Sequence, residues 1–154
     1  MATELTHQKY KQLYETDYNL WVLETVKKLQ NRELDSLDWK NLIDEVLDLS
    51  RREKRRLESL LTRLLEHLLK LKYWDSKREL NQNHWQREIR NFRKQIKRDL
   101  KASPSLKNYL VEQFSELYQD ARELVSDASG LPLDHFPEPP IAPLEKVLDE
   151  NWLP

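Results

Sequence analysis

The sequence predicts an all-α protein: a bundle of about four main helices with a long central second helix and an extended, proline-rich C-terminal arm. The 154 residues include one glycine, whereas Leu, Lys, Glu and Arg are abundant, which favours long helices joined by few tight turns. No alternating run rich in Val, Ile or Thr indicates a strand. We therefore expect a single helical domain over residues 1–154, with an N-terminal arm (1–13), the bundle (14–130) and the C-terminal arm (131–154), which ends in a short helix.

The first two predicted helices begin at capping residues. Thr16 or Asp17 caps a helix within ETDYNLWVLETVKKLQ. Its apolar residues recur at helical spacing: Leu20, Trp21, Val26 and Leu29. After the turn NRELDS, Asp38 caps the long second helix, which is predicted to run to about Trp74.

The long second helix carries an apolar stripe that changes width along its length. At about 100° per residue, the stripe contains Trp39, Ile43, Val46, Leu57, Leu61, Leu64 and Leu68. Its second half is widened by Leu60, Leu65, Leu69 and Leu71. That half should therefore be buried on most of its circumference. Ser50 and Glu53 interrupt the stripe, but no Gly or Pro breaks the helix, so we predict one continuous helix with a polar waist.

Two further helices and the arm complete the predicted fold. The third helix, 81–101, has a narrow apolar stripe: Trp85, Ile89, Phe92, Ile96 and Leu100. Ser103 is predicted to cap the fourth helix, with Pro104 at its first position, and Gly130 to end it as a left-handed cap. The five prolines of LPLDHFPEPPIAP favour an extended course. The closing amphipathic turn is expected to clip the arm onto the bundle through Leu144, Leu148, Trp152 and Leu153.

The composition narrows the class of protein. There is no cysteine, which excludes disulfides, thiolate metal sites and cysteine nucleophiles. No apolar run has the length of a signal peptide or a membrane span, so a cytoplasmic protein without membrane contact is expected. Charge is segregated: residues 1–50 carry a net −4, residues 51–101 a net +10 and residues 102–154 a net −7. This pattern fits either a nucleic-acid surface or helices that neutralise one another.

No set of residues points to catalysis, a metal or a cofactor. His67 lies at the flank of the apolar stripe without a local partner, so we predict a structural histidine that hydrogen-bonds a neighbouring helix. Asp44 and Asp48 share a face, but isolated carboxylate pairs are usually solvated or ion-paired. One glycine cannot form a glycine-rich phosphate loop, and no serine lies in a nucleophile elbow. We therefore predict that the protein is not an enzyme.

The third helix carries the most suggestive surface. Seven cations fill the arc opposite its apolar stripe: Arg87, Arg90, Arg93, Lys94, Lys97, Arg98 and Lys101. Such a face suits contacts with phosphates, or with an acidic partner protein. The net charge of −1 for the whole chain argues against a dedicated DNA-binding protein.

A series of blocks resembles one known family. In order along the chain they are LDWKNLIDEVLDL, LLEHLLKLKYW, the W…EI…R pattern from Trp85 to Arg93, SPSL, YQDAREL, GLPLDHFP and LEKVLDENWLP. From about Tyr14 to Pro154 the chain is similar to the bacterial, notably cyanobacterial, family known as domain of unknown function twenty-nine. The resemblance implies an all-helical, single-domain cytoplasmic protein without an established activity.

The resemblance also marks individual residues. Those that match the family pattern are Trp39, Glu45, His67, Lys70, Trp85 and Arg93, and the match gives none of them a catalytic role. A cysteine that the family often has after FPE is replaced here by PPIAP, so no role of that thiol applies to this chain.

The sequence predicts a non-enzymatic module that binds another protein or its own copy. The charge segregation and five tryptophans favour this function, because tryptophan is enriched at the centres of interfaces. The alternative is nucleic-acid binding by the basic face of residues 81–101.

Overall fold

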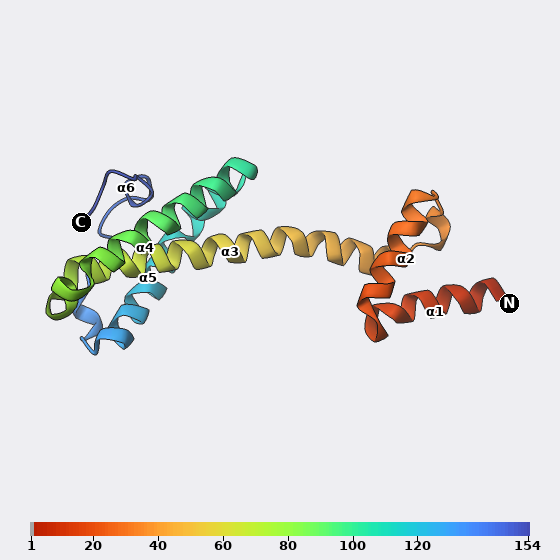
Figure 1. Cartoon of the computed structure of the whole chain (residues 1–154), viewed down its shortest axis with the longest axis horizontal. Coiled ribbons are helices and arrows are strands. Elements are labelled where there is room, and N and C mark those ends of the chain that lie inside the picture. The colour runs from red at the N-terminus through yellow and green to blue at the C-terminus, as the bar shows by residue number, and fades with distance from the viewer. Residues whose placement is uncertain (1) are drawn as a thin grey trace. The chain divides into compact units, whose positions relative to one another are not determined.

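The computed structural model describes residues 2–154, with side chains from residue 6 onward, and over these residues it is all-helical, as predicted. The helices are α1 (Ala2–Thr16), α2 (Tyr18–Gln30), α3 (Trp39–Tyr73), α4 (Asp75–Ala102), α5 (Leu106–Ser129) and α6 (Leu144–Val147) (Figure 1). Two 3-10 turns, Leu34–Ser36 and Leu133–His135, lie between them. No strand occurs in this part of the chain.

The chain divides into two compact units, residues 1–51 and 52–154. The boundary coincides with the polar waist between Ser50 and Glu53, where the sequence places no apolar residue on the stripe. Helix α3 continues through the boundary unbroken, as the lack of Gly and Pro predicted. The apolar stripe of α3 therefore has residues in both units.

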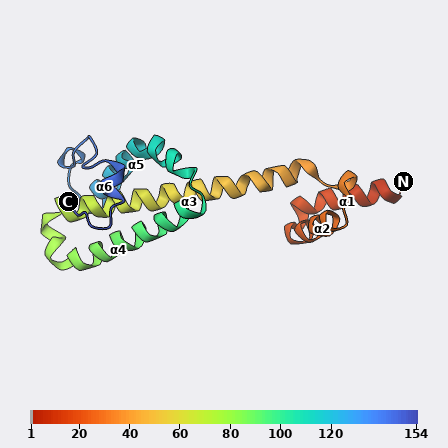
Figure 2. The ribbon, with the colours of Figure 1, turned by 90° about the horizontal axis from the view of Figure 1, so that it is seen from above.

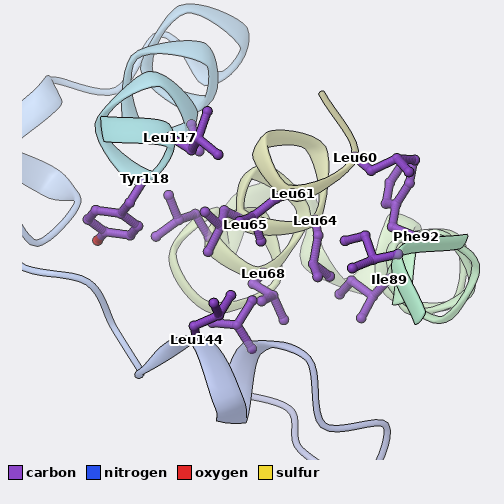
Figure 3. Packing of buried hydrophobic residues seen from close by; sticks show 14 of the residues in the cluster. Leu60, Leu61, Leu64, Leu65, Leu68, Ile89, Phe92, Leu117, Tyr118 and Leu144 are labelled. Carbon is purple, nitrogen blue, oxygen red and sulfur yellow. The ribbon is translucent and has the colours of Figure 1, made fainter. Parts of the chain in front are cut away.

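The second unit has a large leucine core on α3. Leu57, Leu61, Leu64 and Leu68 are 0% exposed, which confirms the burial predicted for the widened half of the stripe. Helices α4 and α5 flank this half of α3 in both ribbon views (Figures 1 and 2). The close-up shows side chains of three other helices that pack around the α3 leucines: Ile89 and Phe92 of α4, Leu117 and Tyr118 of α5, and Leu144 of α6 (Figure 3).

Several helix ends agree with the sequence. Asp17 caps α2 by accepting from the Leu20 N–H at 3.1 Å. The Asp38 carbonyl accepts from the Leu42 N–H at 2.9 Å, the first intrahelical bond that an N-cap residue makes. Gly130 ends α5 at φ 73°, a left-handed conformation that costs a residue without a side chain little.

Three boundaries differ from the prediction. Helix α1 occupies most of the segment predicted as an N-terminal arm, and α4 begins at Asp75 rather than near residue 81. Ser103 ends α4 instead of capping α5: its N–H donates to the Asp99 carbonyl, and its hydroxyl donates to Glu53 at 3.1 Å. Ser105 precedes α5 without a side-chain cap. Polar helix ends carry no apolar period, so their boundaries were not readable from the stripe.

The segment after α5 is fastened by side-chain donors. Arg122 of α5 donates through Nε and Nη2 to the Phe136 carbonyl, at 3.2 and 2.9 Å. The Tyr118 hydroxyl donates to the Pro137 carbonyl at 2.6 Å, and burial raises its pKa to about 12. Because prolines lack an N–H, this segment forms few backbone pairs, and its buried carbonyls accept from side chains instead.

The closing turn packs largely as predicted. Leu144 is buried, and Leu148 and Trp152 pack partly buried against the core of the second unit. Leu153, by contrast, is 44% exposed.

Candidate interaction surface

The first unit is held together by polar and aromatic contacts. The Trp21 Nε1–H donates to Asp38 Oδ2 at 3.1 Å, and Asn41 donates to the same oxygen at 2.7 Å. The Tyr10 hydroxyl donates to Thr25 Oγ1 at 2.6 Å, because the Thr25 hydroxyl itself donates to the Trp21 carbonyl. These buried bonds fix the positions of α1, α2 and the start of α3 without a large aliphatic core.

Glu45 joins α3 to the two preceding helices. Tyr14 donates to its Oε1 and Tyr18 to its Oε2, each at 2.6 Å. The bond to Glu45 is the main cause that raises the Tyr14 pKa to about 12. The Tyr14 ring also meets the edge of Trp21, with centroids 4.9 Å apart. The family-pattern residue Glu45 therefore has a structural contact within the first unit.

The aliphatic side chains of the first unit lie mostly on its surface. Among its described side chains, the buried hydrophobic ones are Tyr10, Trp21 and Leu37, against twenty-two in the second unit. Large hydrophobic side chains that are 44% exposed or more are more numerous: Tyr18, Leu20, Leu23, Val26, Leu34, Trp39, Ile43, Val46, Leu47 and Leu49. An apolar surface of this extent on a small unit is typical of a binding surface.

The α3 stripe is uncovered in its first half. Trp39, Ile43 and Val46 are 48%, 54% and 59% exposed, although the same stripe is fully buried at Leu57 and Leu61. No element of the first unit covers these three residues, although they share a helical stripe with the buried leucines. We call four of the exposed apolar residues of α3 the uncovered stripe: Trp39, Ile43, Val46 and Leu47. The Trp39 Nε1–H donates to the Leu34 carbonyl at 3.0 Å, which fixes the ring.

The basic face of α4 is exposed except at one residue. Arg87, Arg90, Lys94, Lys97, Arg98 and Lys101 are exposed, as predicted. Arg93 is 2% exposed and donates through Nε to the Val147 carbonyl at 2.8 Å, so its assignment to the solvent arc was wrong. The signal was present in the spacing. Arg93 follows Ile89 by four residues and precedes Ile96 by three, which places it beside the buried stripe.

His67 is buried as a packed ring, 8% exposed. Its Nδ1–H donates to the Arg63 carbonyl at 2.8 Å, and its ring contacts Phe92 of α4 edge-on, with centroids 5.3 Å apart. The prediction of a hydrogen-bonded, structural position agrees with these contacts, but the bond is made to its own helix and not to a neighbouring one. Burial lowers the His67 pKa.

Because its pKa is lowered in the folded state, the neutral His67 ring stabilises the fold relative to the charged one. The unfolded chain therefore binds more protons, and this stability is full above the ordinary histidine pKa, near 6.5, and is lost as pH falls through the lower folded pKa. We expect the free energy of unfolding, measured in urea, to fall more between pH 7.5 and 5.5 for the wild type than for His67→Gln. His84→Gln, at an exposed histidine, is the control. Equal pH dependence of the wild type, His67→Gln and His84→Gln would contradict this expectation.

The other two family-pattern side chains of the second unit are also packed. Lys70 forms an ion pair with Glu66 at 3.0 Å, with both side chains largely buried. Trp85, 4% exposed, stacks on Trp74 at 5.8 Å between centroids. Trp85 therefore belongs to the core of the second unit, and Lys70 is ion-paired along α3.

Asp44 and Asp48, the two carboxylates considered as a metal site, have different surroundings. Asp48 pairs with Arg51 at 2.9 Å, whereas Asp44 is exposed. Within the residues that the structure describes, no three His, Cys, Asp or Glu side chains are grouped as around a metal ion. In the same part of the chain, no helix combines the length and apolar character that a membrane span requires.

Comparison with known proteins gave one family. The family model described as domain of unknown function DUF29 matches residues 13–153, nearly the whole chain. Neither the curated proteins nor the solved structures contain a match.

Proposed function

The chain belongs to the DUF29 family, and we propose that it is a non-enzymatic interaction module that pairs with a second copy of itself through the uncovered stripe of α3. The observation that carries the proposal is the exposure of Trp39, Ile43 and Val46 on a helix whose stripe is elsewhere buried. Burying these apolar side chains in an interface would stabilise it by about 25 cal/mol per Å² of apolar surface removed from water.

The size of the exposed surface supports a protein partner. A standard interface buries roughly 800 Å² per partner. Ten apolar side chains of the first unit are 44–61% exposed and are available for such an interface. Trp39 adds a large ring held in place by its bond to Leu34, which is the kind of residue that contributes most at interface centres.

The apolar character of the uncovered stripe supports a second copy as the partner. Antiparallel pairing of two α3 helices centred near Ile43 would place Trp39 of each copy beside Leu47 of the other. The same apolar side chains then lie on both sides of the interface, as in isologous interfaces generally, and no covered residue of the leucine core takes part.

The test is the mass of the protein in solution at tens of micromolar, by light scattering after gel filtration. We expect twice the chain mass of 18.7 kDa for the wild type and a monomer for Val46→Asp, because a buried carboxylate is costly in an apolar interface. Leu80→Asp is the matched control, since Leu80 of α4 is 84% exposed and lies outside the stripe. A monomeric wild type, or a Val46→Asp protein of dimer mass, would refute self-pairing through this face.

Nucleic-acid binding by α4 is the second candidate, favoured by the exposure of six of its seven predicted cations. Phosphate contacts would give an affinity that falls steeply with salt. Two observations rank it second. Arg93 is withdrawn from the face, and Lys97 lies 3.6 Å from Glu150 of the C-terminal segment.

A further inference from the structure

A cleft of about 380 Å³ lies beside the basic helix, between α4, the start of α5 and the residues after α6. Its apolar wall consists of Ile96, Leu100 and Leu148. This volume lies within the range of sites for small molecules, which combine an apolar lining with a few charged groups.

One residue in the lining has an unused hydrogen-bond donor. Arg93 is 2% exposed, and its Nε–H is occupied by the Val147 carbonyl. Its Nη2 is buried and has no hydrogen-bond partner in the structure. A buried guanidinium N–H without an acceptor costs stability, so such a group usually meets an anion or a carbonyl. Burial lowers the Arg93 pKa while Asp149 and Glu150 raise it.

Two lysines complete the positive side of the cleft. Lys107 lies in the first turn of α5, where the helix dipole is positive. Lys97 reaches the cleft from α4 and pairs with Glu150 at 3.6 Å. Both side chains of that pair are more than half exposed, so an incoming anion can replace the carboxylate at little cost. Asp149 and Glu150 balance only two of the three cations.

We propose that this cleft binds a small molecule that joins an oxyanion, a phosphate or a carboxylate, to an apolar body. The oxyanion accepts from the Arg93 guanidinium and from Lys107, and takes the place of Glu150 beside Lys97. The apolar body lies against Ile96, Leu100 and Leu148. This site is independent of the proposed pairing of α3, because none of its residues belongs to the first unit.

The test is isothermal titration of the full chain at constant ionic strength with four probes: phenyl phosphate, benzoate, inorganic phosphate and benzyl alcohol. We expect saturable binding of phenyl phosphate or benzoate with one site per chain, and the tighter of the two identifies the oxyanion. Inorganic phosphate lacks the apolar body and benzyl alcohol lacks the charge, so both should bind at least tenfold more weakly. Failure of both aromatic anions to bind at millimolar concentration would overturn the proposal, as would equal binding of inorganic phosphate.

Variants separate this site from general attraction to a basic surface. Lys107→Gln should weaken binding of the aromatic anion at least tenfold, because it removes one of the contacting charges. Lys101→Gln removes an exposed charge of α4 outside the cleft lining and should leave the affinity unchanged. Arg93→Lys keeps the charge but loses the planar pair of donors, so it should weaken binding if the chain folds. Equal affinities for wild type and Lys107→Gln would refute the site without touching the question of self-pairing.

Discussion

Leu64→Ala should lower the free energy of unfolding by about 3–5 kcal/mol, the cost of a cavity in a well-packed core. Leu64 is 0% exposed and lies among the α3 leucines that meet Ile89 and Phe92 of α4 (Figure 3). Other α3 leucines also hold α4 and α5 against opposite sides of α3. The two helices therefore cannot move freely into the space that the deleted atoms leave. Urea unfolding followed by circular dichroism measures the loss.

Leu80→Ala is the matched control for this prediction. The same atoms are removed from an α-helix, but Leu80 is 84% exposed, so the change should stay within about 0.5 kcal/mol. Equal losses of stability in both variants would show that the effect does not come from the leucine core.

Arg122→Met is expected to cost about 2–4 kcal/mol, because it removes charge-assisted hydrogen bonds and leaves buried carbonyls without a donor. Arg122 is 6% exposed and reaches the Phe136 carbonyl through two nitrogens, while Nη1 donates to Gln119 at 2.6 Å. Methionine retains the apolar part of the side chain, so the loss reports on the guanidinium.

The destabilisation caused by Arg122→Met should be strongest in the C-terminal segment. Limited proteolysis should cut Arg122→Met within residues 131–154 faster than the wild type, because these residues lose the bonds to Phe136 and Leu133. Arg122→Lys should recover only part of the protection, since an ammonium lacks the planar fork. Arg87→Met, at an exposed arginine of α4, should behave as the wild type does. A segment equally resistant in Arg122→Met would contradict the fastening role.

The sequence predicted the features that local chemistry decides. The end of α5 follows from Gly130, the start of α3 follows from Asp38, and its continuity follows from the absence of Gly and Pro. The burial of the leucine-rich half follows from its width, because a helix that is apolar on most of its circumference must be covered on most sides. These signals lie within one helix and need no knowledge of its neighbours.

The features that were missed depend on partners distant in the chain. Trp39 and Leu57 lie on one stripe, yet only the second is covered, because α4 and α5 pack against one half of α3. Both Arg93 and Arg122 are charged. From the sequence, Arg93 was placed on the solvent-exposed face of its helix and Arg122 was not identified. Each can be buried because backbone carbonyls of the C-terminal segment accept its hydrogen bonds. Charge alone does not reveal such a position, whereas spacing beside buried residues does: Arg122 follows Tyr118 by four residues.

The fastening of the C-terminal segment sets an order for folding. The bond from Arg93 to the Val147 carbonyl joins residues 54 positions apart, and that from Arg122 to Phe136 joins residues 14 apart. Neither donor is in place before α4 and α5 have formed and packed, and closing the longer loop first would cost more chain entropy. During synthesis these residues also leave the ribosome after α4 and α5. The segment therefore docks at the end of folding, onto a surface that the earlier helices have already completed.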